Sequence, residues 1–198
     1  MKRVTAAGLA AAALIAGAAA AQEPEYFRAP GHPLTVRDAP AGTPIGELAR
    51  GAAPIEATGV DDSGAWARIA FGEGDGWVAL DALTTMRVPD AAYGPLPAGL
   101  LCAGSEPFWS ARFGPETVET QAPGEEPQSF AVDGAVVAQG AARFPLAVRI
   151  GEMTAVLRPG ACFDGMSDRT HAWSVDLLIA RPGALALRTG CCRLPPAR

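Results

Sequence analysis

Three acidic side chains are the strongest candidates for chemistry in this sequence. Glu106 lies a few residues after Cys102, while Asp164 and Asp168 follow Cys162. Carboxylates whose surroundings push their pKa values apart can act as general acid and general base, so disulfides that bring these segments together would build a hydrolytic site. We favour a structural role, because acids beside glycine in tight loops commonly bind backbone N–H groups. In that role Glu106 accepts hydrogen bonds from backbone N–H groups, and Asp164 caps the Gly165 turn. Asp168 pairs with Arg169 or Arg193.

Ser167 and His171 form a weaker candidate pair of nucleophile and base. Their spacing fits one helical face, but the surrounding composition indicates a loop and lacks a glycine-serine-glycine elbow. A lone histidine in a loop is typically solvated, so we expect His171 to face water. Asp164, Ser167 and Asp168 offer oxygen ligands but lack the spaced acids of a calcium loop. No zinc spacing and no phosphate-binding glycine loop is present, so we predict no metal and no cofactor.

Four cysteines all lie in the second half of the chain, at positions 102, 162, 191 and 192. No Cys-x-x-Cys segment occurs, and the two histidines are far apart in the sequence, which favours structural disulfides over a redox or metal site. A bond between the neighbours Cys191 and Cys192 would be strained. Two arrangements remain open: Cys102 pairs with one of these neighbours, and Cys162 pairs with the other.

The amino terminus has the pattern of a signal peptide at residues 1–21. A short basic start is followed by an apolar stretch over residues 6–16 and by Ala19-Ala20-Ala21, which suits cleavage before Gln22. The apolar stretch is shorter than the ~20 residues needed to span a bilayer. No later span is predicted, and no cysteine follows the cleavage site to carry a lipid. We expect a soluble periplasmic or secreted protein.

The composition favours an all-β protein. Hydrophobic residues make up 49% of the chain and charged residues 19%, which excludes a disordered polar protein. The 23 glycines and 18 prolines would interrupt a helical bundle but suit short strands joined by turns. The net charge is −5 and the basic residues form no cluster, so nucleic-acid binding is excluded.

Residues 26–86 show brief apolar stretches separated by glycine and aspartate turns, which predict a small barrel. The segment resembles the bacterial SH3-like (SH3b) domain in its motifs: Leu34-Thr35-Val36-Arg37, Ile45-Gly46-Glu47-Leu48, Arg50-Gly51, Trp66-Ala67-Arg68-Ile69 and Gly76-Trp77-Val78. The resemblance implies a binding or targeting module, which in some relatives recognises cell-wall peptides. Arg37, Trp66 and Trp77 are the candidate ligand-binding residues. The alternatives are packing for the two tryptophans and a bond from Arg37 to a turn carbonyl.

Residues 87–97 have the proline- and glycine-rich composition of a linker. Beyond it, residues 98–194 alternate apolar and polar side chains, as in the set Trp173, Val175, Leu177 and Ile179. This pattern predicts an antiparallel β barrel or sandwich pinned by the disulfides.

Three motifs in this half resemble a family of uncharacterised exported proteins and lipoproteins of proteobacteria. They are Cys-x-Gly-x-Glu-Pro-Phe-Trp at 102–109, Cys-x-Asp-x-Met-Ser-Asp at 162–168 and Gly-Cys-Cys at 190–192. The resemblance implies an exported β domain and no particular reaction. His171 stands where an aromatic residue is common in that family.

Three functions are compatible with these features. We favour an exported, non-enzymatic envelope protein whose SH3-like module binds peptidoglycan or an envelope protein. The first alternative is an envelope hydrolase that uses Glu106, Asp164 and Asp168. The second is a structural stress-tolerance factor. The sequence does not determine the oligomeric state.

Overall fold

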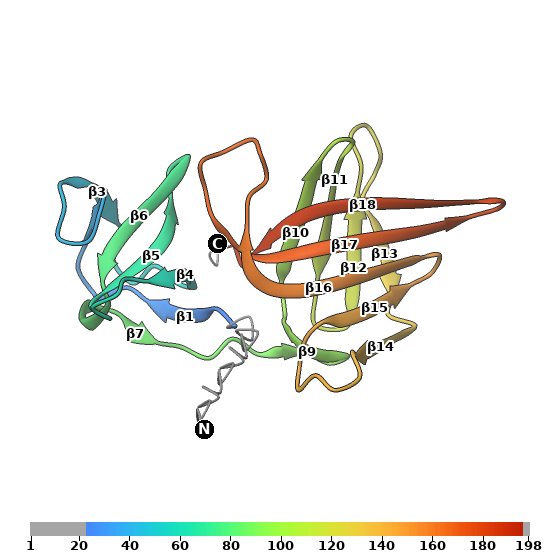
Figure 1. Cartoon of the computed structure of the whole chain (residues 1–198), viewed down its shortest axis with the longest axis horizontal. Helices are drawn as coiled ribbons and strands as arrows, with labels where there is room; N and C mark the ends of the chain where they lie inside the picture. The colour runs from blue at the N-terminus through green and yellow to red at the C-terminus, as the bar shows by residue number, and fades with distance from the viewer. Residues whose placement is uncertain (1–22, 196–198) are drawn as a thin grey trace, which may run out of the picture.

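The computed structural model describes residues 23–195 and is built almost entirely of β-strands (Figure 1). One 3-10 turn, η1 (Leu80–Ala82), is the only helical element within this range. No helix in the described range has the length and apolar character needed to cross a membrane. The strands form two large antiparallel sheets, which confirms the all-β prediction. The predicted signal peptide, residues 1–21, lies outside the described residues.

The N-terminal sheet contains seven strands in the order β3-β2-β6-β5-β4-β1-β7. Its strands are β1 (Glu25–Arg28), β2 (Leu34–Arg37), β3 (Pro44–Leu48), β4 (Ile55–Val60), β5 (Trp66–Phe71), β6 (Gly74–Ala79) and β7 (Thr84–Thr85). Alternate residues such as Val36, Ala67 and Val78 are buried in one small core. The residues between them therefore face away from that core, because successive side chains of a strand point to opposite faces.

The C-terminal sheet contains nine strands in the order β13-β12-β11-β10-β18-β17-β16-β15-β14. They are β10 (Leu100–Ser105), β11 (Phe108–Phe113), β12 (Thr117–Gln121), β13 (Gln128–Ala131), β14 (Gly134–Val137), β15 (Leu146–Ile150), β16 (Met153–Cys162), β17 (His171–Arg181) and β18 (Ala184–Arg193). The sheet curls around its own core, and its longest hairpin, β17–β18, extends beyond the other strands (Figure 1).

The core of the C-terminal sheet contains the apolar residues that were predicted from the alternation of apolar and polar side chains. Trp173, Val175 and Leu177 are all buried in it, together with Leu157 of β16. At one end, Trp109 packs against two glycines of the motifs described above. A Cβ atom at Gly104 would lie 2.3 Å from the Trp109 Nε1 atom, and one at Gly190 would lie 2.3 Å from the Ala103 carbonyl oxygen. These two positions therefore require glycine.

The segment 87–97, predicted as a linker, carries the short hairpin of β8 (Asp90–Ala91) and β9 (Gly94–Pro97). Leu96 is fully buried in the core of the C-terminal sheet. The Tyr93 hydroxyl donates a hydrogen bond of 3.0 Å to the Gly114 carbonyl oxygen. This part of the segment therefore packs as a portion of the C-terminal unit.

Two disulfides start from the neighbouring residues Cys191 and Cys192. Cys192 bonds Cys102, its cross-strand partner on β10, and Cys191 bonds Cys162 at the end of β16. This is one of the two arrangements left open by the sequence. β18 is thereby bonded covalently to its neighbour β10, which is the first strand of this sheet along the chain, and to the end of β16.

The two halves touch through a buried chain of hydrogen bonds. The Trp173 indole N–H donates to the Tyr26 hydroxyl at 3.1 Å, and that hydroxyl donates to a Glu56 carboxyl oxygen at 3.1 Å. Burial raises the pKa of Tyr26 well above its usual value and raises the pKa of Glu56 to about 7. Hydrogen bonds from Tyr26 and from the Leu194 backbone oppose the shift of Glu56 but do not cancel it.

Removing the Cys102–Cys192 bridge by serine at both positions should destabilise the protein more than removing the Cys162–Cys191 bridge. The sequence separations are 90 and 29, for which the chain-entropy model gives losses of about 4–5 and about 3–4 kcal/mol. Urea denaturation without reductant measures both values. Unchanged unfolding free energies in both double variants would contradict the structural role.

The variant Glu56→Gln should remove a pH dependence of stability. Because the folded pKa is raised from 4.5 to about 7, the folded state binds more protons than the unfolded state between those values. Stability of the natural protein should therefore fall as the pH rises through this window. Thermal unfolding across the same window should show a flatter profile for Glu56→Gln, and identical profiles would refute the assignment.

Candidate functional site

The three residues predicted to bind a ligand lie on one face of the N-terminal sheet. Arg37 on β2 is the cross-strand partner of Trp77 on β6, and Trp66 lies on the adjoining strand β5. All three are half-buried and alternate with the core residues of their strands. They therefore share the face that points away from the core.

The Arg37 guanidinium joins two neighbours on this face. It lies 5.8 Å from the centre of the Trp66 ring, within the range of a cation–π contact. Its Nη1 also donates a hydrogen bond of 2.7 Å to the Gly42 carbonyl, which is the turn contact offered above as an alternative. A groove of about 450 Å³ is lined by Trp66 and by residues that include Leu80 and Asp81. We call Arg37, Trp66 and Trp77 the arginine–tryptophan face.

A second cavity, of about 370 Å³, lies on the C-terminal sheet on the side opposite its core. Phe108 and Ser110 of β11 line it and alternate with the core residues Trp109 and Ala111. The loop over residues 163–170 supplies the opposite wall. The cavity is lined by Leu101, Ala103, Gly104, Ser105, Phe108, Trp109, Ser110, Gln121, Ala122, Pro123, Asp164, Met166, His171, Cys191 and Arg193. We call it the loop cavity.

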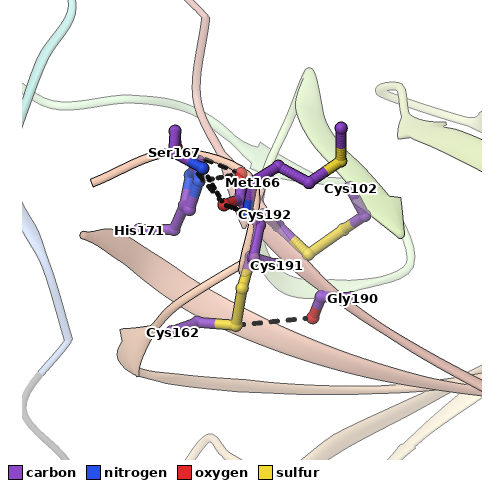
Figure 2. The surroundings of a disulfide bond; sticks show 9 residues. Cys102, Cys162, Met166, Ser167, His171, Gly190, Cys191 and Cys192 are labelled. Carbon is purple, nitrogen blue, oxygen red and sulfur yellow. Dashed lines mark hydrogen bonds and ion pairs between the residues drawn. A yellow bond between two sulfur atoms is a disulfide. The ribbon is translucent and has the colours of Figure 1, made fainter. Parts of the chain in front are cut away.

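The disulfide Cys162–Cys191 anchors this loop at its base. Cys162 is the cross-strand partner of His171, so the loop begins and ends at one point of the β16–β17 hairpin. The register shifts between Pro159 and Cys162, where Gly160 has a φ of 141°, which favours glycine. Figure 2 shows the two disulfides leaving neighbouring cysteines in different directions, with Ser167, Met166 and His171 beside them.

Asp164 organises the loop. One carboxyl oxygen accepts hydrogen bonds from the backbone N–H groups of Met166 at 2.9 Å and Ser167 at 3.0 Å. The other lies 3.2 Å from His171 Nε2, and the Ser167 hydroxyl contacts both oxygens. Partial burial alone would raise the pKa of Asp164, but these bonds outweigh it and lower the pKa to about 2. The prediction that Asp164 caps the Gly165 turn is thus confirmed.

His171 is buried, with 6% of its surface exposed, so the expectation that it faces water is wrong. Its Nε2 meets a carboxylate that only accepts hydrogen bonds, which assigns the proton to this nitrogen. Ser167 bonds Asp164, and no hydrogen bond joins Ser167 to His171 among the described residues. The arrangement therefore lacks the contact by which a histidine activates a serine nucleophile.

The three acids considered for hydrolysis are not joined into one site. Glu106 and Asp168 are exposed, and only Asp164 lines the loop cavity. The predicted pairing of Asp168 with Arg169 or Arg193 is wrong, because among the described residues Asp168 forms no ion pair. The Arg169 guanidinium instead lies 3.1 Å from the Glu73 carboxylate. The expectation that Glu106 binds backbone N–H groups is also wrong, because within residues 23–195 its side chain accepts no hydrogen bond and forms no ion pair.

The sequence did not reveal that the loop also binds the N-terminal sheet. Thr170 donates from its backbone N–H and its hydroxyl to the two oxygens of Asp75, at 2.8 and 2.6 Å. The Asp168 N–H donates to the Glu73 carbonyl at 3.0 Å. Asp75 shares a strand and a face with Trp77, so the loop docks beside the arginine–tryptophan face. Local patterns hold no signal for contacts between such distant segments.

Metal binding has no support in this region. Within the part of the chain that the structure describes, no three His, Cys, Asp or Glu side chains are grouped as ligands would be. The oxygens of Asp164 are already occupied by donors from the loop. The chemical role of Asp164 is to hold the loop and to orient His171.

The variant Asp164→Asn should make the protein less sensitive to acid. Because the folded pKa of Asp164 is lowered from 3.8 to about 2, its stabilising effect is present above pH 3.8 and is lost as the pH falls toward 2. The variant should be less stable at neutral pH and should lose less stability on acidification. Thermal unfolding across this pH range tests the prediction, and parallel curves for both proteins would contradict it.

No protein-family model, no curated protein and no solved structure matches this chain.

Proposed function

We propose that this chain is an exported envelope protein that binds peptide material through its SH3-like N-terminal half and catalyses no reaction. The observation that carries the proposal is the arginine–tryptophan face. Arg37, Trp66 and Trp77 come from three different strands and share one partly exposed surface. Aromatic and arginine side chains are enriched where proteins bind other molecules.

The chemistry of this face suits a peptide that carries a carboxylate. Arg37 uses Nη1 for the Gly42 carbonyl, which leaves other guanidinium N–H groups available for a ligand. A guanidinium binds a carboxylate through paired hydrogen bonds, and indole rings cover the apolar parts of a peptide. Peptides of the cell wall and of envelope proteins both have this combination of groups.

Two features support a periplasmic or secreted location. Residues 1–21 have the pattern of a cleavable signal, and all four cysteines are paired in disulfides. Disulfides persist in oxidising compartments such as the periplasm.

The alternatives have less support. A hydrolase that uses Glu106, Asp164 and Asp168 needs these carboxylates in one pocket, but only Asp164 lines the loop cavity. A structural stress-tolerance factor needs no binding face, so a variant of Arg37 that keeps its stability should then have no effect.

Retention of the full chain on purified peptidoglycan tests the proposal. The variants Arg37→Gln and Trp66→Ala should each weaken retention by about tenfold. The first loses a charge-assisted hydrogen bond to the ligand carboxylate and the second loses an aromatic contact, and each is worth about 1.5 kcal/mol. Sedimentation with peptidoglycan at several concentrations measures the effect.

The matched control is Arg50→Gln, which removes an exposed arginine from the same half. This variant should bind like the natural protein. Thermal unfolding identifies any variant whose fold is lost. Absence of retention on peptidoglycan, together with no difference between Arg37→Gln and Arg50→Gln toward envelope proteins, would overturn the proposal.

A further inference from the structure

We infer that the loop cavity is a second binding site, which takes a ligand with an apolar body and a single carboxylate. It lies on the C-terminal sheet and is lined by none of the residues of the arginine–tryptophan face. Its volume of about 370 Å³ is within the range of small-molecule sites, roughly 300–1,000 Å³. The C-terminal end of a peptide and a short acyl chain share this chemistry.

The walls of the cavity are mainly apolar. Leu101 and Pro123 line it, with Phe108 on the sheet and Met166 on the loop. Phe108 is 54% exposed and Met166 is 64% exposed, so the protein leaves two large apolar side chains uncovered beside one cavity. Neighbouring exposed apolar side chains are typical of binding sites, whereas scattered ones are ordinary. The apolar body of a ligand would remove this surface from water.

The charged groups of the cavity favour an anion. Asp164 is saturated with donors from Met166, Ser167 and His171, so it offers little to a cation. Arg193 also lines the cavity, and within residues 23–195 it forms no ion pair. An arginine that is half-buried without a paired carboxylate is a suitable partner for the carboxylate of a ligand.

Glu56 is not a full counter-ion for Arg193. Arg193 and Glu56 both line the groove between the two halves, where the charge of Arg193 lowers the pKa of the Glu56 carboxyl. Burial nevertheless raises the pKa of Glu56 to about 7, so this group is only partly ionised near neutral pH. The charge of Arg193 is therefore incompletely balanced by the protein.

The polar groups away from Arg193 suit amide or hydroxyl groups of a ligand. Ser105, Ser110 and Gln121 line the cavity on the sheet side. Their side chains both donate and accept hydrogen bonds. A few polar groups among apolar walls are the usual means by which a small-molecule site orients its ligand.

Calorimetric titration of the full chain tests this inference with two acids and their neutral amides. The probes are acetyl-alanyl-leucine with its amide, and octanoate with octanamide. At least one acid should bind about tenfold more tightly than its amide, because only the acid pairs with Arg193. A preference for the peptide acid identifies a peptide C terminus as the ligand, and a preference for octanoate identifies an acyl chain.

Three variants locate the binding. Arg193→Gln should abolish the preference for the acid, whereas Arg181→Gln, at an exposed arginine at the end of β17, should preserve it. Met166→Ser should weaken binding of acid and amide alike, and its exposed position keeps the fold intact. Because the arginine–tryptophan face also suits a carboxylate peptide, the same titration on Arg37→Gln separates the two sites. A preference for the acid that is lost in Arg193→Gln belongs to the loop cavity, whereas one that is lost only in Arg37→Gln belongs to the arginine–tryptophan face and to the function proposed above.

Two results would overturn the inference. One is equal affinity of acids and amides, or no binding of either, in the natural protein. The other is an unaltered preference for the acid in Arg193→Gln. Should Arg193→Gln fail to fold, unchanged affinity in Met166→Ser would exclude the loop cavity as the site.

Discussion

The two disulfides at Cys191 and Cys192 are the constraint on which the C-terminal half depends. Successive residues of a strand point to opposite faces, so one bridge is directed to each side of β18. Cys192 and its partner Cys102 are fully buried in the core, whereas Cys191 lines the loop cavity. One bridge therefore joins β18 to its neighbour β10, which are the last and first strands of this sheet along the chain. The other holds the loop that forms the cavity wall.

That same loop connects the two halves of the chain. It begins at the disulfide-bonded Cys162, is shaped internally by Asp164, and ends with Thr170 bound to Asp75 of the N-terminal sheet. The buried contact from Trp173 through Tyr26 to Glu56 adds a second connection nearby. The loop cavity is thus bounded by this covalently anchored loop, and the arginine–tryptophan face lies on the sheet to which the loop binds. A ligand in the loop cavity would touch the element that borders the arginine–tryptophan face.

The sequence was sufficient for what depends on local pattern. Alternation predicted the buried set that includes Trp173 and Val175, and the Asp164–Gly165 pair predicted a capped turn. The pairing of the cysteines stayed open because either neighbour could reach Cys102 in a linear chain. The contact between Thr170 and Asp75 spans 95 positions, and no local signal encodes such a distance. Leu96 was assigned to a linker because the surrounding prolines and glycine hid one apolar residue that the C-terminal core buries.

The most direct measurement is the cysteine connectivity of the natural protein, determined by partial reduction, alkylation and tandem mass spectrometry. Cys102 and Cys192 are fully buried, whereas Cys162 is partly exposed, so mild reduction should release Cys162 and Cys191 together. The remaining bridge should then join Cys102 to Cys192. Free thiols in the untreated protein, or a bond between Cys102 and Cys191, would contradict the account.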